Sequence, residues 1–179
     1  TTDVYVTGGS EGPGSGYDYV TIKDSALTGG VEWTSRHNGQ ANGDDQAYAM
    51  ALSGTAPSSR LYITGKSVGI GSFTDFGTIQ LAQNDGSENW SSEYNGTGND
   101  EDGAVAMLGG ANPIVLGPST GAGIGLDFAF VEYTGGSGSE KFHVRYNGPA
   151  NSDDIPRALA SSGGGTYVCG SSKITLKGS

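Results

Sequence analysis

The stretch that decides the fold is NGQANGDD, residues 38–45, which opens on an Asn-Gly dipeptide and closes on two adjacent aspartates. The stretch occurs three times in the chain. Residues 95–102 (NGTGNDED) and 147–154 (NGPANSDD) repeat it at offsets of 57 and 52 residues. Self-similarity at a period of about fifty residues is typical of propellers and solenoids. We therefore interpret the stretch as part of a repeating unit, with the Asn-Gly dipeptide expected to form a turn at positive φ.

Four further segments come into register when the copies are aligned on this turn, and each has the apolar, β-branched and aromatic content of a short strand. The first is rich in Ala and covers residues 47–52, 104–108 and 157–160. The second covers 4–8, 61–65, 113–117 and 166–170. The third begins with Asp at 18–22, 75–79 and 127–131, and is expected again at 173–176. The fourth covers 33–38, 90–95 and 142–147.

Four short antiparallel strands per unit, without helical periodicity between them, predict an all-β fold of β-propeller-type blades. We expect about three and a half blades in one domain over residues 1–179, with repeats at 3–45, 46–102, 103–154 and 155–179. The first repeat lacks its inner strand and the last is truncated. The Ala-rich strand is placed innermost because small side chains suit a crowded radius. The side chains expected between the blades are Tyr48, Met50, Val105, Met107, Leu159, Val6, Ile63, Val115 and Val168.

A family resemblance rests on several spacings that agree at once. The run YVTG, DY and TIK between residues 5 and 23, followed by Trp33, Arg36 and the NGQANGDD loop, resembles the SBBP-type repeat. That repeat is the seven-bladed β-propeller repeat of bacterial surface and secreted proteins. The resemblance covers nearly the whole chain and implies a propeller fold and an extracellular or cell-surface setting, without an established catalytic chemistry. Pro113 and Arg157 depart from the pattern at strand positions.

The amino-acid composition limits the classes of partner that the protein is expected to bind. The 179 residues include 33 Gly, and 19 acidic against nine basic residues give a net charge of −10. This balance opposes nucleic acid and anionic membranes as partners, because both need a basic footprint. No apolar run approaches the length of a membrane span. The single Cys169 cannot form an intrachain disulfide and is expected at a small interior site. Asn89 and Asn95 head N-glycosylation sequons.

No catalytic residue is predicted. The G-x-S-x-G pattern of a nucleophile elbow occurs at residues 65–69, but also at 8–12 and 117–121, each time after a strand and never before a helix. A pattern present in every blade indicates structure, since a catalytic serine is needed once. His37 and His143 stand apart from other candidate ligands and are expected in packing or surface positions. We therefore expect a protein that is not an enzyme, with a hydrolase having an axial site as the least favoured alternative.

The acidic loops are the one candidate for a cation. The residues that could bind calcium are Asp44, Asp45, Asp100, Asp102, Asp153 and Asp154. The EF-hand spacing is not met, because the twelfth position counted from Asn38 is Ala49, but calcium accepts looser arrangements of oxygen ligands. The aspartates that open the third strand, at 18, 75 and 127, are expected to cap turns. No other cofactor is expected.

The predicted function is that of a non-enzymatic extracellular structural subunit, which assembles with copies of itself into a ring or filament through incomplete terminal blades. The alternative is a lectin-like module that binds a carbohydrate or another ligand. In that alternative Trp33, Trp90 and Tyr94 would stack on sugar faces, whereas the competing interpretation places the two tryptophans in the blade core.

Overall fold

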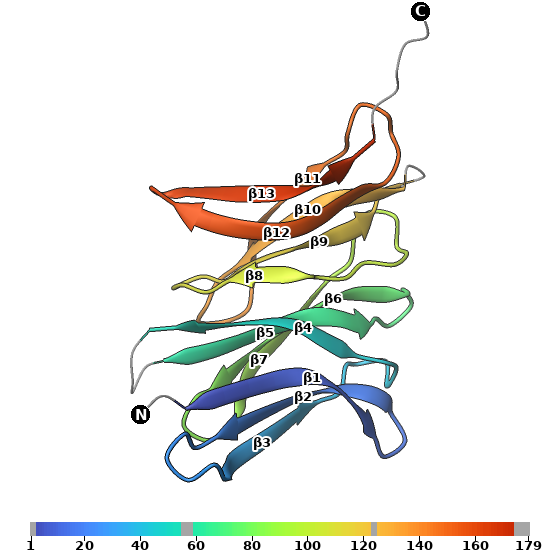
Figure 1. The fold of residues 1–179 in the computed structure, drawn as a ribbon. Helices are drawn as coiled ribbons and strands as arrows, with labels where there is room; N and C mark the ends of the chain where they lie inside the picture. The colour runs from blue at the N-terminus through green and yellow to red at the C-terminus, as the bar shows by residue number, and fades with distance from the viewer. Residues whose placement is uncertain (1–2, 55–58, 123–124, 174–179) are drawn as a thin grey trace, which may run out of the picture.

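The computed structural model describes residues 3–54, 59–122 and 125–173, and within these ranges the chain forms thirteen strands and no helix. The strands make four antiparallel sheets that follow one another along a stack (Figure 1). The first sheet contains β1 (Val4–Gly12), β2 (Gly16–Asp24) and β3 (Val31–His37). The second contains β4 (Gln46–Ser53), β5 (Arg60–Val68), β6 (Thr74–Ala82) and β7 (Glu88–Tyr94). The third contains β8 (Ala106–Leu108), β9 (Ile114–Thr120), β10 (Leu126–Tyr133) and β11 (Glu140–Tyr146), and the fourth β12 (Asp154–Ser162) and β13 (Gly165–Ser172).

Each sheet is built from strands that are consecutive in sequence and paired in that order, as in a propeller blade. The predicted all-β fold of propeller-type blades is therefore confirmed. Equivalent residues keep equivalent partners: Ile63 pairs with Ile79 in the second sheet, and Val115 with Val131 in the third. Of the strand expected at 173–176, all but the first residue lies outside the described residues.

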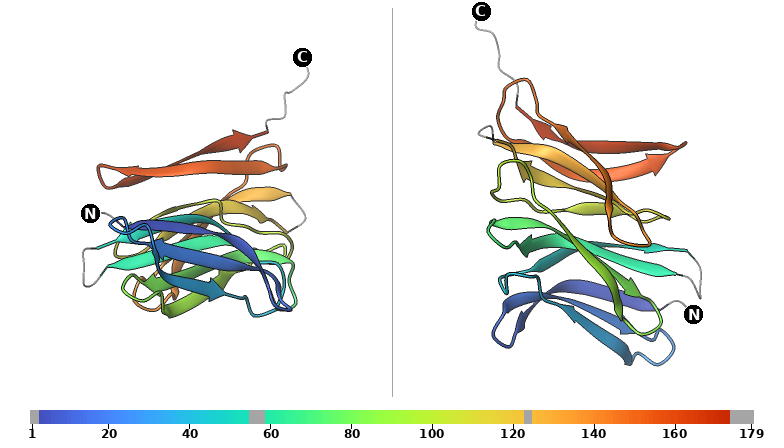
Figure 2. Two further views of the ribbon diagram at one scale, coloured as in Figure 1. Left: turned by 60° about the horizontal axis from the view of Figure 1, so that its bottom comes forward. Right: turned by 180° about the vertical axis from the view of Figure 1, so that it is seen from behind.

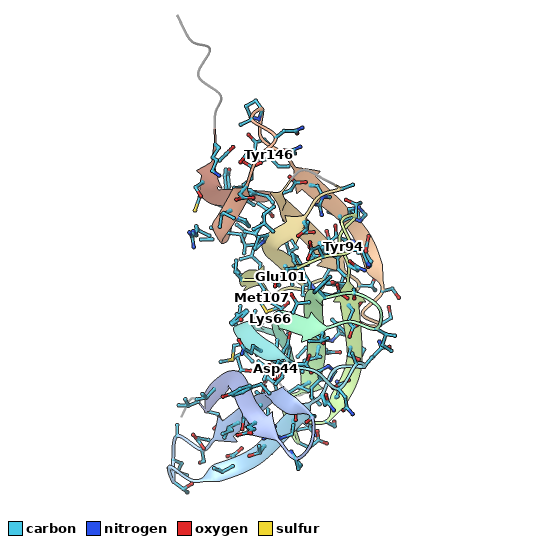
Figure 3. All side chains as sticks on the ribbon, turned by 90° about the vertical axis from the view of Figure 1, so that its right-hand side faces the viewer. Asp44, Lys66, Tyr94, Glu101, Met107 and Tyr146 are labelled. Carbon is cyan, nitrogen blue, oxygen red and sulfur yellow. The ribbon has the colours of Figure 1, made fainter. Side chains whose placement is uncertain are left out.

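Neighbouring sheets approach one another through their Ala-rich strands, since β8 lies against both β4 and β12. The sheets are also turned relative to one another, and the stack follows a curve (Figures 2 and 3). This arrangement places β4, β8 and β12 on the inner side of the curve, in the order expected for a propeller.

The core lies in a different place from the one predicted. Ile63 and Val115 are buried as expected, but Tyr48, Val105, Val6 and Val168 are exposed, while Met50, Met107 and Leu159 are only partly buried. Val6 is exposed because no sheet covers the first one on this side within the described part of the chain, unlike its buried equivalents Ile63 and Val115. The buried clusters lie instead between the later strands of one sheet and the face of the next.

Two tryptophans anchor successive sheets. The Nε1 of Trp33 in the first sheet donates to the carbonyl oxygen of Gln83 in the second at 3.1 Å. Trp90 makes the same bond to Gly135 of the third sheet, also at 3.1 Å. Each indole thus satisfies its polar group while burying its ring, so the same contact is used at both interfaces.

Candidate functional site

The repeated acidic loop forms the joint between successive sheets, and a pair of asparagines holds its middle. The Nδ2 of Asn95 donates to the Oδ1 of Asn99 at 2.6 Å. The same bond joins the equivalent pairs Asn38–Asn42 and Asn147–Asn151. The second asparagine of each pair has a positive φ of 50–58°, in the left-handed region that Asn tolerates. The expectation of positive φ at the Asn-Gly dipeptide is therefore wrong, because the turn is made by the asparagine that follows it.

The glycine of the dipeptide is required for close approach rather than for its φ. A Cβ on Gly39 would lie 2.3 Å from the Oγ of Ser67 and 2.9 Å from the Oδ1 of Asp45. Gly96 and Gly148 are confined in the same way, with a serine Oγ 2.2 and 2.3 Å from the Cβ position. All three glycines are buried, so a larger residue has no direction in which to move.

The last aspartate of the loop bonds to two backbone segments, as the second joint shows. Asp102 is 3% exposed. Its Oδ2 accepts the backbone N–H of Gly96 at 2.5 Å, and its Oδ1 accepts that of Thr120 at 2.7 Å. Gly96 follows the last strand of the second sheet, whereas Thr120 ends β9 of the third. One buried carboxylate thus ties two consecutive sheets together.

Asp45 makes both bonds at the first joint, and Asp154 makes the bond to the loop glycine at the third. Asp45 accepts the N–H of Gly39 at 2.5 Å and that of Val68 at 3.0 Å. Asp154 accepts the N–H of Gly148 at 2.5 Å. A carboxylate that accepts backbone N–H groups replaces the water it lost on burial, which explains why an acid is tolerated there.

The remaining acids of the loops are more exposed. The Oδ1 of Asp44 accepts the N–H of Tyr17 at 2.9 Å, and that of Asp153 accepts the N–H of Leu126 at 3.3 Å. Asp100 is exposed. Asp44 and Glu101 hold equivalent positions at successive joints (Figure 3). Over the described ranges, no three His, Cys, Asp or Glu side chains are grouped so as to hold a metal ion. A calcium site therefore stays a prediction, and the buried acids already serve the backbone.

The aspartates that open β2, β6 and β10 form a second set of buried acids. Asp18 accepts from the Oγ of Ser15 at 3.1 Å and from the Nη1 of Arg36 at 3.0 Å. In the third sheet, Asp127 accepts from the Nη2 of Arg145 at 2.9 Å. In the second sheet Ser72 makes to Asp75 the bond that Ser15 makes to Asp18, so these aspartates bond to a side chain of the turn and not to its backbone, as the expected cap would. The arginine partners are an addition that the sequence analysis missed. Their signal was an Arg 18 residues after the Asp in both repeats.

The three side chains predicted to bind sugars are all core residues. Two of them are the tryptophans that lie between successive sheets. Trp33, Trp90 and Tyr94 are 9%, 8% and 5% exposed. The ring of Tyr94 lies 5.3 Å from that of His143 in the next sheet. Stacking on a sugar needs an open ring face, so these positions fit the core interpretation and not the lectin one.

The two histidines join charged pairs. The Nδ1 of His37 lies 2.7 Å from the Oε2 of Glu88, which links the first sheet to the second. His143 pairs with Glu140 in its own strand at 2.7 Å. Both locations agree with packing or surface roles. Cys169 is exposed, so the interior site expected for it is wrong.

Comparison with known proteins supports the fold alone. No protein-family model matches the sequence, and a search of curated proteins finds no match, so the SBBP-type repeat remains a resemblance. Among solved structures the chain is similar to BamB from Moraxella catarrhalis, a β-propeller protein, with a TM-score of 0.50 and 11% sequence identity. The match covers 88% of this chain and 44% of BamB, so the chain spans less than half the length of BamB. The chain thus has a β-propeller-type fold.

Proposed function

We propose that the protein is a non-enzymatic, extracellular β-propeller scaffold whose blades assemble with those of further copies. The observation that carries this proposal is a pair of exposed faces that match each other. The first-sheet face comprises Val4, Val6, Val20 and Ile22, and the third-sheet face comprises Phe128, Phe130, Val144 and Tyr146. Each is one half of a contact that the chain already makes twice internally.

The first-sheet face has buried counterparts. Val6 pairs with Ile22 just as Ile63 pairs with Ile79 in the second sheet. Ile63 and Ile79 are covered by Tyr19 and Trp33 of the preceding sheet, whereas Val6 is 52% exposed. The first-sheet face therefore has the apolar side chains of a covered blade face.

The third-sheet face has buried counterparts as well. Phe128 pairs with Tyr146 as Phe76 pairs with Tyr94, and the latter pair packs against Val131 of the following sheet. Tyr146 and Val144 are 49% and 55% exposed. A groove of about 460 Å³ remains on this face, lined by Leu116, Phe128, Phe130, Val144, Tyr146 and Val168. Because β12 packs against β8, β9 and β10 of the third sheet, the groove beyond it is left for the first-sheet face of a copy.

Support for a non-catalytic role comes from how the polar groups are used. The buried carboxylates of the joints accept backbone N–H groups, and two of those that open the third strands pair with arginines of their own sheets. These side chains stabilise the blades and their connections. The extracellular setting is proposed from the family resemblance.

Sedimentation velocity over a range of protein concentrations tests the assembly. We expect the wild-type chain to associate as concentration rises, and Val144→Asp to sediment as a monomer because it places a charge in the apolar groove. Glu140→Gln, in the same strand but outside the groove, is the matched control and should associate like wild type. A wild-type chain that stays monomeric at every concentration would refute the proposal.

A further inference from the structure

The second sheet differs from its neighbours at one position of its last strand. Arg36 pairs in register with Val20 and Arg145 with Ala129, so the two arginines hold equivalent places in the first and third sheets. In the second sheet the same place, opposite Gly77, is held by Glu93. The acid that each arginine neutralises is nevertheless retained, as Asp75. In the second sheet two acids, Asp75 and Glu93, thus hold the places that an aspartate and an arginine hold in the other two sheets.

Asp75 is buried and only partly satisfied. Asp75 is 3% exposed, and its Oδ2 accepts a hydrogen bond from the Ser72 hydroxyl at 2.7 Å. Its Oδ1 has no hydrogen-bond partner within the described part of the chain, and the same holds for the Oδ1 of Asp18 and of Asp127, but those two carboxyls have an arginine on Oδ2. A buried carboxylate without a cation or a full set of donors is costly, and it lowers that cost by binding a proton.

The groups around Asp75 do not supply the missing positive charge. Glu93 faces it from β7, and Asp102 approaches from the joint, where its backbone N–H donates to the carbonyl of Thr74. From the first sheet, Tyr19 donates its hydroxyl to Gly77, while His37 is paired with Glu88. The remaining nearby cation is Lys66 on β5. It precedes the residue that pairs with Asp75, so its side chain lies on the opposite face of the strand.

We propose that Asp75 binds a proton in the second sheet, where the equivalent aspartates of the first and third sheets are paired with an arginine. The second sheet is then a proton-sensitive element within an otherwise ion-paired stack. Burial raises the pKa of Asp75 to about 6, with the charges of Asp102 and Glu93 adding to the rise and the Ser72 hydroxyl opposing it.

The sign of the pH effect follows from this rise in pKa. A carboxyl whose folded pKa exceeds its unfolded value binds more protons in the folded state between the two values. Its contribution to stability is therefore fully present below the unfolded pKa and is lost as pH rises through the folded pKa. For Asp75 this window runs from 3.8 to about 6.

The test combines carboxyl NMR titration with urea unfolding of the full chain. We expect the Asp75 carboxyl of the wild type to titrate near pH 6. In Glu93→Arg, which restores the ion pair, its midpoint should fall by more than about one pH unit, as an adjacent opposite charge does. The urea midpoint of wild type should fall between about pH 4.5 and about pH 7.5, and that fall should shrink in the variant. Glu93→Gln, which removes the charge without adding a cation, should lie between the two.

The reciprocal variant guards against a purely local effect of substituting Glu93. Arg36→Glu places the same two acids in the first sheet, and its urea midpoint should then fall more than that of wild type between about pH 4.5 and about pH 7.5. The proposal is overturned if Asp75 of the wild type titrates below about pH 4.5, which is the ordinary range of a carboxyl. It is also overturned if calcium chloride stabilises the wild type but not Glu93→Arg, because the pair would then hold a metal ion.

Discussion

The backbone N–H of Gly96 donates to the Oδ2 of Asp102 at 2.5 Å, which closes a loop of seven residues around a buried carboxylate. The loop ends one blade and starts the next, and the chain repeats it at each joint. The connection between blades is therefore a specific polar structure, built from the acids that the sequence offers as candidate cation ligands.

Replacing the loop glycine should destabilise the fold. In Gly96→Ala the new Cβ would meet the Oγ of Ser119 at 2.2 Å, and both are buried. We expect a loss of about 1–3 kcal/mol from overpacking, visible as a lower melting temperature in calorimetry. Gly136→Ala is the control, because no atom lies within 4 Å of its Cβ position. Equal melting temperatures for the two variants would contradict the close-approach role of Gly96.

The buried carboxylate of Asp102 should contribute more to stability than the negative charge of the loop does. Asp102→Asn leaves one oxygen to serve the N–H groups of both Gly96 and Thr120. Leaving a buried donor unpaired costs about 1–3 kcal/mol, so urea unfolding should show a loss of that order. Asp100→Asn removes the same charge from an exposed position in the same loop and should leave the urea midpoint unchanged. If Asp100→Asn costs as much, the loop acids act through their charge, as in a cation site.

The hydrogen bond of the Trp90 indole should contribute to stability separately from the packing of its ring. Trp90→Phe keeps an aromatic ring between the second and third sheets but removes the Nε1 donor and leaves the carbonyl of Gly135 without that bond. We expect a loss of about 1–3 kcal/mol in the free energy of unfolding. Added glycans should not change the melting temperature, since Trp90 is buried. Stabilisation of the wild type by a glycan, absent in Trp90→Phe, would revive the lectin interpretation.

The ion pair between His37 and Glu88 predicts a pH-dependent link between the first two sheets. Burial lowers the pKa of His37, but the hydrogen bond and charge of Glu88 outweigh it and raise that pKa overall. The His37 contribution is therefore present below its unfolded pKa and lost as pH rises through the folded one. The pKa of Glu88 is lowered by the His37 hydrogen bond, with burial opposing, so its contribution is lost as pH falls through the folded value.

Both contributions are present together at about pH 5–6, between the unfolded values of Glu and His. The stability difference between wild type and His37→Gln should be largest in that range and should shrink toward higher and lower pH. Urea midpoints measured across the pH range check this. A difference that does not change with pH would show that His37 acts through packing alone.

The sequence predicted the strands and their order because the repeat supplies the same pattern several times. Ile63 and Val115 hold the same place in two copies of the repeat, and both are buried as their alternation predicts. The exposure of Tyr48 could not be predicted, since periodicity shows which side a residue faces but not whether another sheet covers that side. The joint was correctly located, but the roles within it depend on distances. Only the structure shows that Asp102 bonds to the backbone, while Asp75 lacks an arginine.

The proposed assembly is tested most directly by mixing two variants that are each blocked on one face. Ile22→Asp disables the first-sheet face and Val144→Asp disables the third-sheet face, so each variant alone should sediment as a monomer with an unchanged melting temperature. A mixture of the two retains one intact face of each kind, and we predict heterodimers that do not grow further. If the mixture stays monomeric while wild type associates, or if either variant alone still associates, the two faces are not partners and the proposed assembly is wrong.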